Sequence, residues 1–60
     1  MTIHEKLYNY YYSIQSKEMQ SEIQGWKPMK MKSVKAAIKI TFKNGDWLRV
    51  YQQDGSVEWY

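Results

Sequence analysis

The C-terminal third of the chain combines two tight-turn signals with segments in which apolar residues alternate. Asn44-Gly45 and Asp54-Gly55 are dipeptides typical of hairpin turns, because glycine readily adopts the positive backbone angles that these turns need. Alternation with a period of two predicts strands that each bury one face. The sequence therefore predicts three antiparallel strands joined by hairpins. The predicted strands cover about residues 35–43, 46–52 and 56–60.

The register of the first predicted hairpin follows from the pairing that keeps the core row apolar. A two-residue turn at Asn44-Gly45 would place Arg49 opposite Ile40, in the core row. A three-residue loop, Lys43-Asn44-Gly45, with Gly45 left-handed at a bulge, instead places Leu48 opposite Ile40. We therefore predict the bulged loop.

The second predicted hairpin needs only the two-residue turn at Asp54-Gly55, which places Val50 opposite Trp59. The two registers together assign every strand residue to one face of the sheet. The predicted core face consists of Ile38, Ile40, Phe42, Leu48, Val50, Val57 and Trp59. The opposite face consists of Lys39, Thr41, Lys43, Trp47, Arg49, Tyr51, Glu58 and Tyr60.

The N-terminal half predicts a helix that begins with a capping box formed by Thr2 and Glu5. No glycine or proline interrupts the chain until Gly25, which we expect to end the helix in a left-handed conformation, with Pro28 just beyond. The predicted helix covers about residues 3–24, and residues 25–33 are predicted to be a connector. A break near residues 13–17, giving two shorter helices, explains the pattern equally well. The fold class is α+β, a single domain with this helix packed on a three-stranded antiparallel meander.

A continuous helix would carry two apolar stripes about 120° apart. The first stripe, predicted to face the core, contains Ile3, Leu7, Tyr10, Tyr11 and Ile14. A domain of 60 residues buries only about 60% of its unfolded surface, so such domains commonly need disulfides, a metal or self-association. The chain has no cysteine and one histidine, His4, so self-association is expected. The predicted homodimer interface is the second stripe, which contains Tyr8, Tyr12, Met19 and Ile23.

The sequence offers no residues arranged for catalysis or for metal binding. It has no second histidine and no paired carboxylates, and Asp46 and Asp54 flank turn glycines, where aspartate is typically a turn residue. We therefore expect no enzymatic activity, no cofactor and no metal site. No apolar run approaches the roughly 20 residues that span a bilayer, and the N-terminus lacks the features of a signal peptide. A cytoplasmic location is expected.

The predicted open face of the sheet mixes aromatic rings with cations. Tryptophan, tyrosine and arginine dominate the energetics of protein interfaces, so the face is a candidate for binding another protein. The same pairs could instead serve only to stabilise the sheet. The candidate partner-binding residues are Trp47, Arg49, Tyr51, Tyr60, Lys39 and Lys43.

Nucleic acid is the alternative partner, because residues 26–60 hold seven basic and three acidic residues. This hypothesis needs a continuous basic track. If the connector runs beside the first predicted strand, the residues that could supply it are Lys27, Lys30, Lys32, Lys35, Lys39 and Lys43. A net charge of +3 and a single arginine weigh against it.

The chain is short, cysteine-free and rich in lysine, isoleucine and tyrosine. In these respects it resembles the small stand-alone proteins carried by phages and mobile elements of low-GC bacteria. The resemblance implies a protein that binds a larger host protein, such as a component of antiviral defence, and blocks it. Our hypothesis from the sequence is a non-enzymatic, homodimeric inhibitor or modulator of a host protein.

Overall fold

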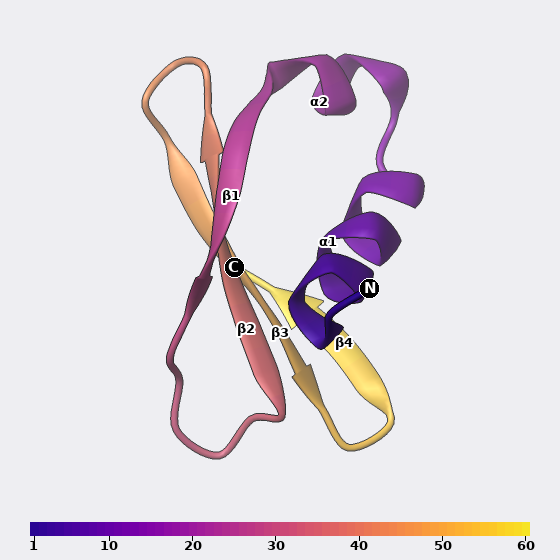
Figure 1. Ribbon diagram of the computed structural model, residues 1–60. Helices are drawn as coiled ribbons and strands as arrows, with labels where there is room; N and C mark the ends of the chain where they lie inside the picture. The colour runs from indigo at the N-terminus through magenta and orange to yellow at the C-terminus, as the bar shows by residue number, and fades with distance from the viewer.

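The computed structural model describes residues 1–60 and consists of two short helices and a four-stranded antiparallel sheet, shown in Figure 1. The strands follow chain order across the sheet, and α1 packs on the two central strands. The α+β class with a helix on an antiparallel meander is therefore confirmed. The elements are α1 (Ile3–Ser13), α2 (Lys17–Glu22), β1 (Ile23–Met29), β2 (Ala36–Phe42), β3 (Trp47–Gln53) and β4 (Ser56–Trp59).

The prediction of three strands is wrong, because residues 23–29 form a fourth strand, β1, where the sequence predicts the helix end and a connector. The register of β1 on β2 shifts between Ile23 and Gly25, so Gln24 is an extra residue in the strand. Gly25 thus serves the bulge and does not cap a helix, and its φ is not positive. Pro28 is tolerated because β1 is an edge strand, where an absent N–H donor need not break the ladder.

The continuous helix over residues 3–24 is also wrong, and the alternative of a break near residues 13–17 is the one observed. Thr2 and Glu5 form the predicted capping box of α1. Ser16 starts a new helix by accepting a hydrogen bond from the Met19 amide at 3.2 Å. The Gln20 side chain donates to the Tyr12 carbonyl at 2.7 Å, and this carbonyl also accepts from the Gln15 amide at 3.2 Å, so the end of α1 is tied to α2.

The predicted hairpin registers are confirmed. In the first hairpin Ile40 lies opposite Leu48, and Gly45 has a φ of 93°, as a bulged loop requires. The Phe42 amide donates to the Asp46 carbonyl at 2.8 Å and closes this loop. In the second hairpin Val50 lies opposite Trp59. The assignment of β2, β3 and β4 residues to two faces therefore holds.

The core lies between α1 and one face of the sheet, which we call the covered face. Ile38, Ile40 and Val50 have no exposed surface, and Leu7 and Tyr11 of α1 pack against them. The remaining residues of the predicted helical stripe, Ile3, Tyr10 and Ile14, are exposed. Of the predicted core row, Leu48 and Val57 are half-buried, and Trp59 is 40% exposed.

Two aromatic contacts fix α1 across the sheet. The Tyr8 ring stacks on Trp26 of β1, with centroids 5.4 Å apart and planes 15° from parallel. The Tyr11 ring meets Trp59 of β4 edge to face, with centroids 5.3 Å apart. One helix therefore reaches both edge strands, and the opposite face of the sheet, which we call the open face, has no helix over it (Figure 1).

A candidate protein-binding face

The open face carries a connected series of rings and cations that we call the ring–cation ladder. The Lys39 ammonium lies 4.7 Å from the centroid of the Trp47 ring. The Arg49 guanidinium lies 4.9 Å from the same centroid and 4.5 Å from the centroid of Tyr60. Tyr60 meets Tyr51 edge to face at 5.8 Å. Five of the six predicted partner-binding residues are thus linked by direct contacts.

The strand register explains why these side chains meet. Lys39 lies opposite Arg49, Thr41 lies opposite Trp47, and the backbones of Arg49 and Tyr60 exchange two hydrogen bonds of 3.1 Å. Residues that are opposite or diagonal on one face are within reach of long side chains. The hairpin turns, which set the register, therefore also build the ladder.

The ladder is held in place yet remains accessible. Trp47 is 47% exposed and Tyr60 is 64% exposed. Each cation–π contact at an exposed site contributes about 0.5–1 kcal/mol, which favours the observed rotamers of Lys39 and Arg49. Side chains that are already ordered lose less entropy when a partner binds. The ladder consequently has the composition and the pre-ordering of a protein-binding surface.

Lys43, the sixth predicted binding residue, lies in the β2–β3 loop and makes no contact with the rings of the ladder. Its side chain is exposed. Its amide donates to the Glu22 carbonyl at 2.8 Å, which ties the loop to the end of α2. Lys43 therefore borders the ladder without belonging to it.

The sequence reasoning missed that β1 extends the open face. Lys27 lies directly opposite Lys39, which lies directly opposite Arg49. We call these three residues the cation row. When Gln24 is treated as a bulge residue and left out of the count, Ile23, Trp26 and Pro28 fall on one face of an extended chain. This alternation would have predicted the strand.

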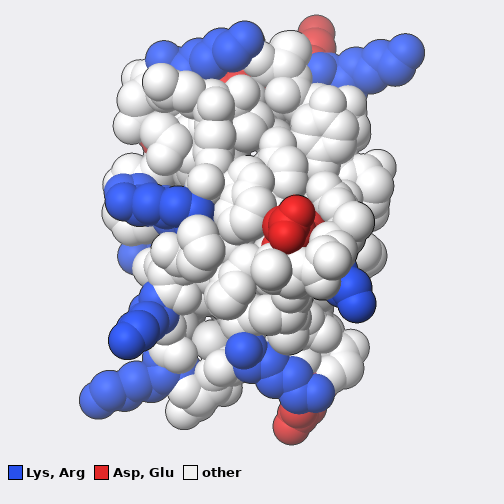
Figure 2. All heavy atoms as spheres, in the orientation of Figure 1, with Lys and Arg blue, Asp and Glu red and all other residues white.

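Figure 2 shows Lys and Arg side chains projecting at several heights from its left margin, the side of β1 away from α1. The one ion pair in the structure joins Lys35 to Asp54 at 3.6 Å, beyond the ends of the strands. Glu58, the acidic residue that faces the same side as the ladder, lies opposite Tyr51 and accepts a hydrogen bond from Ser56. The cation row therefore has no carboxylate paired with it.

The four residues of the predicted dimer interface do not lie on one stripe, because α1 and α2 are separate helices. Tyr8 and Ile23 pack against the core of their own chain. Tyr12 and Met19 are exposed to 40% and 39%. The homodimer stays a prediction, with half of its proposed residues already engaged within the chain.

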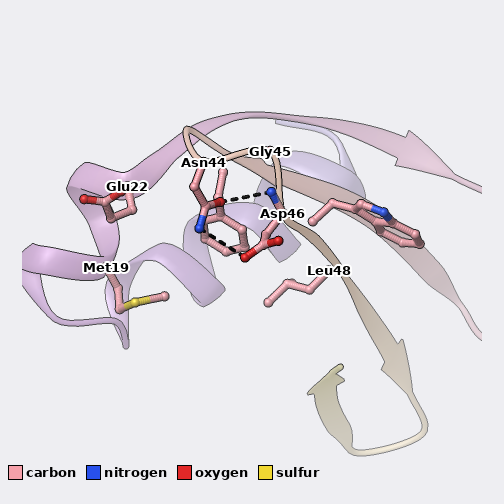
Figure 3. A pocket seen from close by; sticks show the side chains of 8 residues that line it. Met19, Glu22, Asn44, Gly45, Asp46 and Leu48 are labelled. Carbon is pink, nitrogen blue, oxygen red and sulfur yellow. Dashed lines mark hydrogen bonds between the residues drawn. The ribbon is translucent and has the colours of Figure 1, made fainter.

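A hollow of about 580 Å³ lies between α2 and the β2–β3 loop, and Trp47 of the ladder is one of its lining residues. In Figure 3, Met19 and Leu48 point into this hollow from opposite sides, and Glu22, Asn44 and Asp46 form its polar rim. Asn44 donates to the Asp46 carboxylate at 3.1 Å and accepts from the Asp46 amide at 2.9 Å. The side chains of Asn44 and Asp46 therefore stabilise the loop through hydrogen bonds within the loop itself.

The structure contains no group of three or more histidine, cysteine, aspartate or glutamate side chains placed to hold a metal ion. Burial raises the pKa of the Tyr8 hydroxyl, and the neighbouring Tyr12 raises it further. Burial also raises the pKa of the Tyr11 hydroxyl. Both tyrosines belong to the helix on the covered face and serve packing. Neither helix combines the length and the apolar character needed to cross a membrane.

No protein-family model, no curated protein and no solved structure matches this chain. The geometry of the open face is therefore the basis for inferring the function.

Proposed function

We propose that this protein is a non-enzymatic binding module that docks another protein on the ring–cation ladder of its open face. The observation that carries the proposal is the exposed and interconnected set of Trp47, Arg49 and Tyr60 on a face with no helix over it. Rings on a solvated face also stabilise a sheet, but tryptophan, tyrosine and arginine together are the residue types that dominate contact surfaces, which supports the proposal.

A nucleic acid fits this face less well than a protein does. Bases stack on free ring faces, but Lys39 and Arg49 of the chain itself already lie over Trp47, and Arg49 lies over Tyr60. The cation row adds only three charges, which limits the counterion release that drives binding to phosphates. A protein partner can instead pack against ring edges and pair with the cations.

A small binding module can act by covering part of the surface of a larger protein, and we propose that binding blocks the partner in this way. Many of the small phage and mobile-element proteins that the chain resembles in length and composition block a larger host protein in this way. The proposal requires that the open face, and no other exposed ring, captures the partner.

Tyr60 and Tyr10 provide a matched pair of exposed tyrosines, 64% and 50% exposed, on opposite sides of the protein. In affinity capture from the native host lysate after nuclease treatment, the wild type and Tyr10→Ala should retain the same protein. Tyr60→Ala and Trp47→Ala should lose it while keeping the circular dichroism spectrum of the wild type. Equal retention by all four proteins would contradict the proposal, and unfolding of Trp47→Ala would mean that the ladder is there for stability.

A further inference from the structure

The cation row violates a rule of sheet stability. Like charges placed directly opposite one another on adjacent strands are destabilising, and Lys27, Lys39 and Arg49 occupy three consecutive strands in this way. No carboxylate forms an ion pair with any of the three. The contacts of Lys39 and Arg49 with the Trp47 ring do not neutralise these charges, and features that cost stability concentrate at functional sites. An anionic group outside the chain would remove the repulsion.

A hollow of about 330 Å³ lies beside the row, at the end where β1 meets β2. Gly25 lies opposite Thr41, and a Cβ atom built on Gly25 would meet nothing within 4 Å, so the absence of a side chain there opens the hollow. The lining residues are Gln24, Gly25, Trp26, Lys27, Lys39 and Thr41.

The polar groups around this hollow suit a carboxylate. Lys27, Lys39, Thr41 and Gln24 line the hollow and have side chains that carry hydrogen-bond donors, two of them ammonium groups, and no acidic residue lines the hollow. Ammonium and amide donors form charge-assisted hydrogen bonds to carboxylate oxygens. Trp47 lies opposite Thr41, so an anion in the hollow would lie beside the ladder.

We propose that the partner is an acidic protein surface whose carboxylates pair with the cation row, one of them seated in the Gly25 hollow between Lys27 and Lys39. This inference rests on the proposed function and names the chemistry of the partner. Adjacent strands are about 4.8 Å apart, and side chains three or four residues apart on a helix are separated by about 5–6 Å. A helix with glutamates at that spacing therefore matches the row.

The test is a nuclear magnetic resonance titration of the full chain with a helical peptide that carries glutamates at i, i+4 positions. The control ligands are the same peptide with glutamine in their place and a single-stranded oligothymidylate of equal charge. We expect the glutamate peptide to shift the amides of Gly25, Lys27 and Thr41, and to bind more tightly than either control. Tighter binding of the oligothymidylate would overturn the proposal in favour of a phosphate ligand.

Lys27→Glu and Lys17→Glu form a matched pair of variants, because both change the net charge by the same amount. Lys17 lies on α2 and is not part of the cation row, so Lys17→Glu is the control. Lys27→Glu replaces an attraction by a repulsion and should weaken binding of the glutamate peptide about tenfold, which corresponds to about 1.4 kcal/mol. Lys17→Glu should have little effect. Equal weakening by both variants would show unspecific attraction and overturn the proposal.

Gly25→Val fills the hollow without removing any charge, and valine suits an extended strand. It should weaken peptide binding and keep the native amide spectrum, whereas unchanged affinity would exclude the hollow as the site. Should this variant unfold, Lys39→Gln tests the charge at the hollow instead, because it removes one ammonium group; unchanged affinity of this variant would also exclude the hollow as the site.

The capture experiment separates this inference from the proposed function. Loss of the partner by Tyr60→Ala but not by Lys27→Glu would leave the binding function intact and overturn the acidic contact. Loss by neither variant would contradict both proposals.

Discussion

The two faces of the sheet have opposite character although they alternate along the same strands. On the covered face, Ile38, Ile40 and Val50 are completely buried beneath α1. On the open face, their immediate neighbours Lys39 and Arg49 hold exposed rings in place and repel one another. The buried residues of the covered face therefore provide the stability that offsets the repulsion within the cation row of the open face.

The largest effect expected from this comparison is on the covered face. Ile40→Ala should lower the free energy of unfolding by about 2–5 kcal/mol, because it leaves a cavity among fully buried side chains. Trp47→Ala, on the open face, should lower it by about 1–2 kcal/mol, from the loss of two cation–π contacts of about 0.5–1 kcal/mol each. Urea denaturation of both variants measures the difference. A larger loss for Trp47→Ala would reverse the assignment of roles.

Stability at alkaline pH provides a second test of the covered face. The pKa values of Tyr8 and Tyr11 are raised in the folded protein above the ordinary value of 10.0, because burial disfavours the charged phenolate. Above pH 10 the unfolded chain therefore loses these protons more readily than the folded protein. Stability is fully present below pH 10 and should fall as the pH rises through the folded pKa values.

The variants Tyr8→Phe and Tyr11→Phe remove these hydroxyl groups while keeping the rings. Each should reduce the alkaline loss of stability relative to the wild type, measured by thermal denaturation across this pH range. Tyr10→Phe is the control, because the Tyr10 side chain is half exposed on the same helix. An alkaline loss that is the same in all four proteins would contradict the role of burial.

The smallest expected effect is a gain in stability on the open face. Lys27→Glu replaces a like-charge pair with an attractive pair opposite Lys39, which should raise the free energy of unfolding by about 0.2–1 kcal/mol. Lys17→Glu again serves as the control for net charge. If Lys27→Glu is more stable but binds less well, the cation row is kept for binding. If Lys27→Glu is less stable, the like charges of the row do not destabilise the sheet, which would contradict this prediction.

The sequence was sufficient to predict the elements whose signals are local. The capping box at Thr2 starts α1, and the turn glycines Gly45 and Gly55 both have positive φ, so the registers of β2, β3 and β4 followed from turn chemistry and alternation. The same registers placed the five ladder residues on one face together with Lys43, although the contacts that join the five and leave out Lys43 had to come from the structure.

The missed strand β1 shows where local signals fail. Gly25 and Pro28 are both depleted in strands, and the bulge at Gln24 shifts the alternation by one residue, so residues 23–29 do not have the pattern of a strand. Pairing with β2 and the stacking of Trp26 on Tyr8 overcome this weak preference. Because β1 was missed, the cation row and the Gly25 hollow were missed with it.

In vivo photo-crosslinking tests the central claim, that the open face is the binding surface, most directly. With p-benzoylphenylalanine placed at the position of Tyr60, we expect a crosslink to a single larger protein. The same group at the position of Tyr10, on the other side of the protein, should give no such product. A crosslink formed from the position of Tyr10 but not from that of Tyr60 would contradict the claim.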